Sequence, residues 1–150
     1  MLKLIVGVMA AALSLTLVGA QETLPEGPGK QTVERVCTTC HDVDTVAGTR
    51  MVRGDWRAMV NSMMSRGATA SDQEVVEIIE YLATYLGMVN VNKAAVDEIA
   101  AVLAIPSKEA DEIVKYRAAN GEFKDMESLM KVPGVDAKVL QERKDRIAFR

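Results

Sequence analysis

The stretch Cys37-Thr38-Thr39-Cys40-His41 has two cysteines separated by two residues and followed directly by a histidine. In this spacing the two thiols lie about one helical turn apart, so both can bond the vinyl groups of one porphyrin while the adjacent imidazole reaches its iron. The sequence therefore predicts that Cys37 and Cys40 attach one haem c covalently and that His41 is an axial ligand of its iron.

A structural disulfide, a redox dithiol and a metal site are the alternatives for this stretch. A redox dithiol of the thioredoxin type would lie in a strand-helix-strand pattern, which the neighbouring sequence lacks. A closed zinc site needs about four ligands, and the stretch supplies three. His41 is the only histidine of the chain, so one molecule cannot ligate a haem iron with two histidines.

The first 20 residues have the features of a secretory signal peptide. A short basic start precedes an apolar run from Leu4 to Val18, and Val18-Gly19-Ala20 places small residues at the cleavage positions. An uncleaved membrane anchor is the alternative, but the run is short for a span. We therefore expect residues 1–20 to be cleaved, leaving an exported, soluble protein without a transmembrane segment.

Helical patterns fill the remaining chain, and no strand pattern of convincing length is present, so the predicted fold class is all-α. After an extended lead-in and a helix from Thr32 into the cysteine pair, residues 42–54 are expected to be mostly loop. Asp55 is expected to cap a helix from Trp56 to about Ser65, and Ser71-Asp72-Gln73-Glu74 is a capping box that opens another.

The composition changes at residues 88–92, and we place a domain boundary near residue 89. Beyond it, Asn92 is expected to cap a helix with Val96 and Ile99 on one face. A tight turn at residues 104–107 leads into a second helix. Two further helices are expected over Met126–Lys131 and Asp136–Ile147, so that helix-turn-helix units follow one another as a weak repeat.

With His41 as one axial ligand, the sixth position of the iron can be filled by a thioether, a lysine or water, or can stay open. The thioether candidates are Met51, Met59, Met63, Met64 and Met88. Methionines at helical spacing are more often part of a core than ligands, so the spacing alone leaves the choice open.

Residues 32–87 resemble the small single-haem cytochrome c domain of bacterial quinohaemoprotein amine dehydrogenases and related periplasmic dehydrogenases. The resemblance rests on Cys37, Cys40, His41, Arg53, Trp56, Val60, Met63, Gly67-Ala68, Glu74 and Tyr81-Leu82. It implies a periplasmic location and Met63 as the axial ligand, with Met64 as the runner-up. Methionine opposite histidine raises the potential and fills the site that oxygen would need, which favours electron transfer over catalysis.

Three further residues are candidates for the surroundings of the haem. Trp56 is expected to pack against the porphyrin, or to be a plain core residue. Arg53 and Arg50 are expected to neutralise the haem propionates, because guanidinium groups suit carboxylates, or to be solvated loop charges.

Residues 89–150 resemble the tandem helix-hairpin-helix domain of ComEA-type competence DNA receptors. The matching residues are Val91-Asn92, Ala94, Glu98-Ile99-Ala100, Ile105, Ala110, Ile113-Val114, Tyr116-Arg117, Asn120-Gly121, Phe123, Leu129, Val132, Gly134 and Arg146-Ile147. In such domains the resemblance implies hairpin glycines that let backbone N–H groups approach a DNA phosphate. Here one hairpin reads Ala104-Ile105-Pro106, whose proline has no N–H, and the other reads Gly134-Val135-Asp136, which adds a carboxylate.

The charge balance also argues against strong DNA binding. Residues 91–150 hold 7 Lys and 4 Arg against 5 Asp and 6 Glu, and residues 21–90 hold 1 Lys and 5 Arg against 10 acids. DNA affinity comes mostly from neutralising phosphates, and this balance supplies little of it. The candidate contacts to a phosphate or a protein partner are Gly134, Lys108, Lys138 and Lys144.

We therefore expect a signal peptide at 1–20, a monohaem cytochrome c domain at 21–88 and two helix-hairpin-helix motifs at 89–150. The predicted function is one-electron transport between periplasmic redox proteins, without enzymatic activity, and the second domain would dock partners. The alternative is an exported DNA-binding protein, similar to a competence receptor, with a haem-bearing redox domain. A small haem enzyme is a third hypothesis, which an open sixth ligand position would favour.

Overall fold

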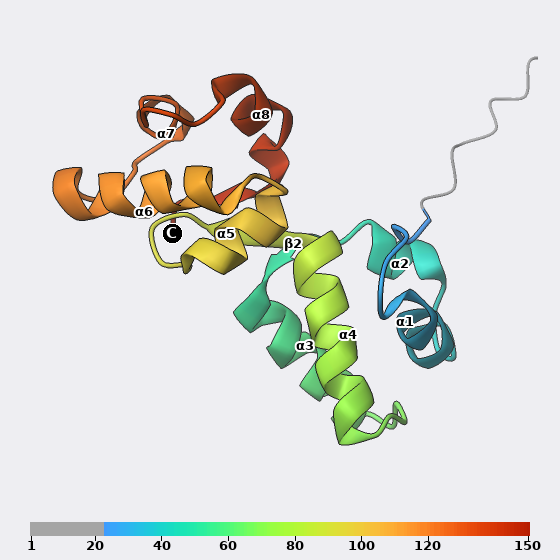
Figure 1. Cartoon of the computed structure of the whole chain (residues 1–150). Helices are drawn as coiled ribbons and strands as arrows, with labels where there is room; N and C mark the ends of the chain where they lie inside the picture. Colours follow the sequence, from blue (N-terminus) through green and yellow to red (C-terminus); the bar gives the residue numbers. More distant parts are fainter. Residues whose placement is uncertain (1–22) are drawn as a thin grey trace, which may run out of the picture.

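The computed structural model describes residues 23–150, and the predicted signal peptide, residues 1–20, lies outside them. The described chain is mostly helical and forms two lobes that meet at a short strand, β2 (Gly87–Asn90) (Figure 1). The first lobe (residues 23–86) contains α1 (Lys30–Cys37), α2 (Val43–Ala47), α3 (Arg53–Ser65) and α4 (Asp72–Tyr85). The second lobe (residues 91–150) contains α5 (Val96–Leu103), α6 (Ser107–Asn120), α7 (Met126–Leu129) and α8 (Ala137–Glu142). In residues 23–150, no helix is both long and apolar enough to cross a membrane.

Helix α4 is the central helix of the first lobe and begins where the capping box predicted it. The Ser71 hydroxyl accepts a hydrogen bond from the Glu74 N–H, and the Glu74 carboxylate accepts one from the Ser71 N–H. These bonds satisfy N–H groups that the first helical turn leaves without partners. The helix packs its buried stripe against α1 and α3. This core includes Val33, Val36, Trp56, Val60, Ile78, Ile79, Leu82 and Leu86.

Two local expectations for the first lobe were wrong. Residues 43–47, expected to be loop, form the single-turn helix α2, which buries Val46 and Ala47. Helix α3 begins at Arg53 rather than Trp56, so Asp55 lies inside its first turn instead of capping it. A carboxylate in that turn still stabilises the helix by interacting with its dipole.

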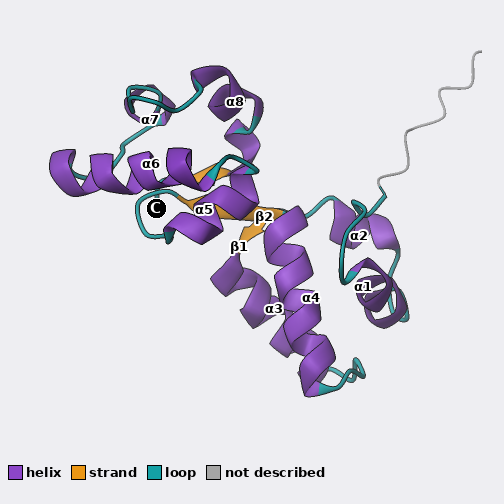
Figure 2. Ribbon diagram, in the orientation of Figure 1, coloured by secondary structure: helices purple, strands orange, loops and turns teal. Residues whose placement is uncertain are grey.

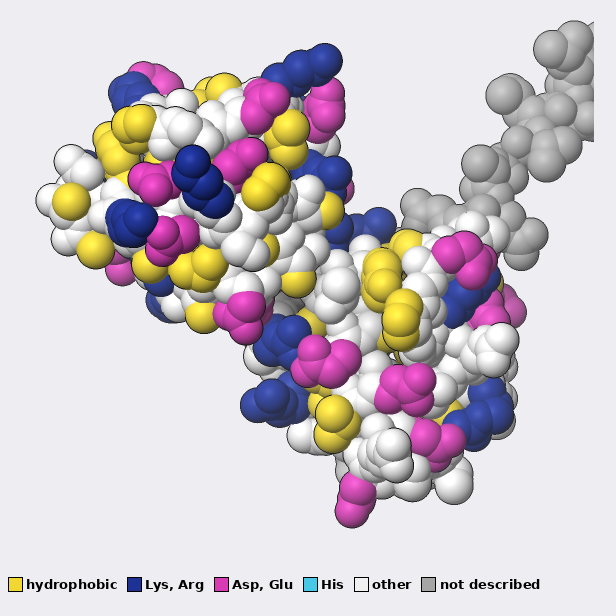
Figure 3. Space-filling view, in the orientation of Figure 1, with side chains coloured by type: hydrophobic (Ala, Val, Ile, Leu, Met, Phe, Trp, Pro, Cys, Tyr) yellow, Lys and Arg dark blue, Asp and Glu magenta, His cyan; other side chains and the backbone are white. Residues whose placement is uncertain are grey.

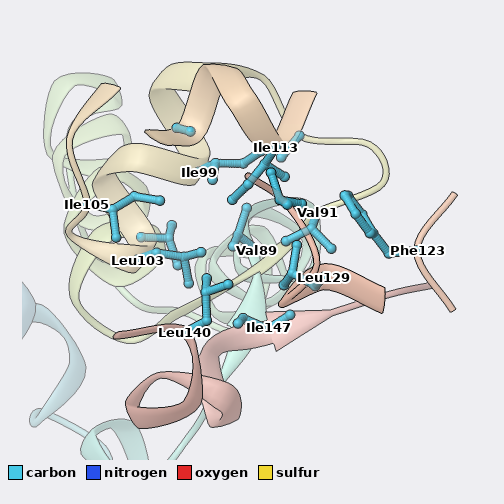
Figure 4. Close-up of a cluster of buried hydrophobic side chains, with 14 residues drawn as sticks. Val89, Val91, Ile99, Leu103, Ile105, Ile113, Phe123, Leu129, Leu140 and Ile147 are labelled. Carbon is cyan, nitrogen blue, oxygen red and sulfur yellow. The ribbon is translucent and has the colours of Figure 1, made fainter. Parts of the chain in front are cut away.

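The second lobe packs two helical hairpins, α5–α6 and α7–α8, around one core (Figure 4). Asn92 was predicted to cap α5, but Ala95 is the N-cap residue. The Asn92 side chain instead donates to the carbonyls of Phe123 and Phe149, at 2.8 and 2.9 Å, and accepts from the Phe123 N–H at 2.8 Å. It thereby joins the start of the lobe to the segment before α7 and to the end of the chain.

The fold is mostly helical, as predicted, but a short three-stranded parallel sheet that the sequence did not predict connects the lobes (Figure 2). Strand β2 lies between β1 (Met51–Val52) and β3 (Ile147–Ala148), with Met51 opposite Gly87 and Val89 opposite Ile147. The helix expected over 136–147 therefore ends early. Helix α8 stops at Glu142, a 3-10 turn covers Lys144–Arg146, and Ile147 is buried in extended conformation beside Val89. Such β-branched pairs favour strands.

Polar contacts also cross between the lobes. The Arg146 guanidinium donates to the carbonyl oxygens of Gly87, at 3.1 Å, and Thr84, at 2.5 Å. Arg53 of α3 forms ion pairs with Glu80 of the same lobe and with Glu98 of α5, the latter at 3.8 Å between Nε and Oε1. The expected boundary at residue 88/89 falls inside β2, the strand that both lobes share, and it remains a prediction.

Candidate functional site

The first lobe contains a cavity of about 400 Å³ between α1, α3, α4 and the segment from Cys40 to Met51. The motif residues Cys37, Cys40 and His41 all lie on its wall. The rest of the wall is mostly apolar. It consists of Val36, Thr45, Val46, Thr49, Met51, Trp56, Met59, Val60, Met63, Met64, Arg66, Ala68, Ile78 and Leu82.

The end of α1 presents the two thiols to this cavity. Cys37 is the last helical residue and is partly buried, which raises the pKa of its thiol, whereas Cys40 is exposed. The hydroxyls of Thr38 and Thr39 donate to the carbonyls of Glu34 and Arg35, at 2.6 and 3.0 Å. These bonds satisfy the last carbonyls of the helix, so the chain can turn and bring Cys40 and His41 to the same wall. Both cysteines are free.

The His41 ring lies on the cavity wall with Nδ1 3.5 Å from the carbonyl oxygen of Asp42. Histidines that ligate a metal usually direct one ring nitrogen toward a carbonyl or carboxylate, which orients the ring and leaves the other nitrogen for the metal. The position of His41 is compatible with that role, although the contact to Asp42 is long.

Trp56 is buried to 3 % exposure on the cavity wall, as a haem-packing residue would be. Its indole N–H has no hydrogen-bond partner among the described residues. Buried N–H groups are almost always paired, so an unpaired one beside a cavity indicates a missing acceptor. The propionate carboxylates of a haem are acceptors of this kind.

The cavity does not decide between the two methionine candidates. Met63 and Met64 both line it and are both partly buried, while Met59 is 38 % exposed and Met51 lies on β1. Met88 is on β2 and does not line the cavity. The choice of Met63 over Met64 therefore still rests on the resemblance.

The two arginines expected near the propionates are not among the residues that line the cavity. Arg50 donates to the carbonyls of Ala47 and Thr49, at 2.7 and 2.9 Å, and Arg53 is in the ion pairs with Glu80 and Glu98. Neither lines the cavity, but Arg66 does. Arg66 was not predicted as a site residue, although its position three residues after Met63 places it at the same end of α3.

These observations show that the described residues fit a haem. The wall supplies two thiols, an imidazole, four thioethers, an unpaired N–H and a guanidinium, and apolar side chains make up most of its surface. A volume of about 400 Å³ lies within the range of about 300–1,000 Å³ that is usual for small-molecule sites.

The two hairpin turns of the second lobe differ from simple phosphate-binding turns. In the first, Ala104 adopts the left-handed conformation (φ 47°) and Pro106, which has no N–H, is the N-cap of α6. In the second, Gly134 has φ 79°, and the Asp136 side chain accepts from the Lys138 N–H at 2.8 Å. The Glu109 carboxylate accepts from the Asp136 N–H at 3.4 Å. The protein's own carboxylates therefore occupy N–H groups that a phosphate would need.

Comparison with known families assigns the second lobe. Residues 86–148 match the family model of the helix-hairpin-helix motif. This span includes α5–α8, β2 and β3, so both hairpins of the second lobe lie within the match to the helix-hairpin-helix model. The match does not include the Cys37–His41 motif.

Two curated proteins are similar to part of the chain. An uncharacterized protein of Haemophilus influenzae is 39% identical over 61 residues, which are 40% of this chain and 54% of that protein. ComE operon protein 1 of Bacillus subtilis is 30% identical over 63 residues, 42% of this chain and 31% of that protein. The chain thus spans about half the length of the first relative and about a third of the second. No solved structure matches the chain.

The candidate lysines are spread over the helix-hairpin-helix domain. Lys108 is exposed in the first turn of α6, and Lys138 is exposed in the first turn of α8, 3.9 Å from the Glu142 carboxylate. Lys144 lies in the 3-10 turn before β3, next to the sheet rather than in a hairpin turn. Gly134 and Lys138 therefore share one hairpin, Lys108 belongs to the other, and Lys144 is near the junction of the lobes.

Proposed function

We propose that the first lobe carries one haem, attached through Cys37 and Cys40 and ligated by His41 and Met63, and that the protein transports single electrons in the periplasm. The observation that supports this proposal is the convergence of the cysteine-histidine motif and two methionines on one apolar cavity. These donors come from α1, the following turn and α3, and no local pattern requires them to meet.

A haem bound in this cavity would supply one-electron exchange. The side chains of the lobe would hold it and set its properties. Cys37 and Cys40 would anchor it, and His41 and Met63 would ligate its iron, which would leave no ligand site for oxygen or peroxide. Trp56 and Arg66 would offer an N–H and a positive charge to the propionates. Apolar residues such as Val60 and Leu82 would exclude water. This arrangement suits an electron carrier rather than an enzyme.

The replacement Met63→Ala is expected to abolish the weak near-infrared sulfur-to-iron band of the oxidised protein. Loss of the thioether opens the sixth position of the iron, so the potential should also fall. Both effects are measured by optical spectroscopy during a redox titration of protein from a host that attaches haem c.

The matched control is Met64→Ala, because Met64 is the adjacent residue on the same helix and the same cavity wall. The band should persist in this variant. The reverse result, with the band lost only in Met64→Ala, would assign the ligand to Met64, and a band that neither replacement affects would contradict ligation by Met63 and by Met64.

The second candidate function is DNA binding by the helix-hairpin-helix domain of an exported protein. The family match over residues 86–148 and the similarity to ComE operon protein 1 favour it, and these comparisons support it better than they support electron transport. Helix-hairpin-helix domains can bind nucleic acid through backbone N–H groups at their turns, independently of base sequence. The two candidates concern different lobes, so each can be tested without the other.

The carboxylates at the second hairpin predict how DNA affinity should respond to mutation. The double variant Glu109→Gln, Asp136→Asn removes two negative charges beside the Asp136 and Lys138 N–H groups and keeps an N-cap side chain at position 136. If this domain binds DNA, the variant should bind duplex DNA about tenfold more tightly at low salt, since charge neutralisation dominates such affinity. The affinity for duplex DNA is measured by fluorescence anisotropy over a series of salt concentrations.

The control is Glu122→Gln, Glu127→Gln, which removes the same charge from exposed positions outside both hairpin turns. It should raise the affinity less. Equal gains in both double variants would mean that DNA responds to net charge alone, and no binding by any variant at low salt would contradict the second candidate.

A further inference from the structure

The parallel sheet brings together two arginines that are 96 positions apart in the sequence. Arg50 directly precedes β1, and Arg146 directly precedes β3. Because both strands run parallel to β2, with Met51 opposite Gly87 and Ile147 opposite Val89, these arginines meet at the same end of the sheet. The Arg146 side chain reaches further along this end to the carbonyls of Thr84 and Gly87.

Two more cations lie beside this pair. Arg143 follows α8, and Lys144 opens the 3-10 turn that ends with Arg146. Burial lowers the pKa of Arg146, and the charges of Arg143 and Arg50 lower it further, so the three guanidinium groups lie close together. The negative charge of Asp145 acts in the opposite direction and raises the pKa of Arg146. We call Arg50, Arg143, Lys144 and Arg146 the junction patch.

The positive charge of the junction patch is not neutralised within the described structure. No member forms an ion pair with any residue from 23 to 150, whereas Lys30, Arg35 and Arg53 of the first lobe all pair with glutamates. The arginine partners that the structure gives are neutral carbonyls. Figure 3 shows Lys and Arg side chains gathered where the lobes meet. Residues 21–90 otherwise have an excess of acids.

The patch adjoins the cavity through Arg50. Arg50 lies between Thr49 and Met51, which both line the cavity. Its other members follow α8, after the turns at residues 104–106 and 134–136. From this placement we propose that the junction patch docks the acidic face of a redox protein, with the helix-hairpin-helix domain supplying most of the charge. This inference rests on the proposed electron transport and names the class of partner for it.

Rates of electron exchange with small charged probes test the proposal. The reduced protein gives one electron to ferricyanide, which becomes ferrocyanide, and the oxidised protein takes one electron from hexaammineruthenium(II), which becomes the ruthenium(III) ion. The double variant Arg143→Gln, Lys144→Gln should lower the rate constant with anionic ferricyanide about threefold or more at low ionic strength. The rate constant with the cationic ruthenium complex should not fall. High salt should erase the difference from the unmodified protein.

The matched control is Lys124→Gln, Lys131→Gln, which removes the same charge near α7, far along the chain from the patch. It should change the ferricyanide rate much less. Equal changes in both double variants, or none in either, would overturn the proposal. The proposal would also be overturned if the patch variant kept its ferricyanide rate but lost duplex DNA binding, because the patch would then be a nucleic-acid surface. A colourless protein would instead overturn the proposed electron transport and this proposal with it.

Discussion

Replacing Cys37 and Cys40 together with alanine is expected to leave the protein without any covalently attached haem. Both thiols lie on the cavity wall, and no other cysteine exists to replace them. Haem staining of a denaturing gel should fall from one haem per chain to none. A lobe whose cavity of about 400 Å³ lacks its ligand should also be less stable, since a group that binds only the folded state stabilises it. We expect the midpoint of thermal unfolding to fall by roughly 10 °C.

Thr38→Ala, Thr39→Ala is the control within the same five residues. These threonines bond the last carbonyls of α1 but do not line the cavity. This variant should keep its haem and lose only about 1 kcal/mol of stability. The unmodified protein should bind haem when it is expressed in a host that attaches haem c. If it binds no haem there, electron transport by haem is contradicted, and the motif would instead form a disulfide or a redox dithiol.

The replacement Gly87→Ala is expected to cost about 3–5 kcal/mol of folding free energy. A Cβ atom at this position would lie 1.7 Å from the carbonyl oxygen of Ala83, which belongs to the backbone of α4 and cannot rotate away. Any shift of Gly87 would also disturb its pairing with Met51 and its hydrogen bond from Arg146. Both lobes should lose stability together. Urea denaturation followed by circular dichroism measures the loss.

Gly54→Ala provides the matched control. Gly54 lies in the first turn of α3, and a Cβ there would meet no atom within 4 Å. Because alanine favours helices, this change should stabilise the protein by about 0.5–1 kcal/mol. A Gly87→Ala protein as stable as the unmodified one would show that the junction between α4 and β2 tolerates a large rearrangement.

Features with local signals could be predicted from the sequence. The capping box at Ser71 determines where α4 begins, because its two hydrogen bonds join residues only three positions apart. The cysteine-histidine spacing and the helical methionines identified residues that share one cavity. The resemblance at residues 89–150 identified the helix-hairpin-helix domain, which the family match over 86–148 supports.

Features that depend on distant residues could not be predicted in this way. Strands β1 and β3 have two residues each, too few to show alternation, and they form because they pair with β2, from 36 to 58 positions away. The ion pairs of Arg53 could not be predicted for the same reason, since its partners Glu80 and Glu98 lie on α4 and α5. Asn92 resembles a helix cap in its local sequence, yet its side chain donates hydrogen bonds to the carbonyl oxygens of Phe123 and Phe149.

The shared strand β2 limits how the protein can be divided for experiments. A cut at residue 88/89, where the composition changes, would break β2 between its pairing with β1 and its pairing with β3. Each fragment would then retain a pairing of only two residues, and Arg146 would lose its carbonyl partners Thr84 and Gly87. Recombinant fragments of either half should therefore both retain Gly87–Asn90, and a poorly behaved short fragment would reflect the site of the cut rather than an inability of that half to fold.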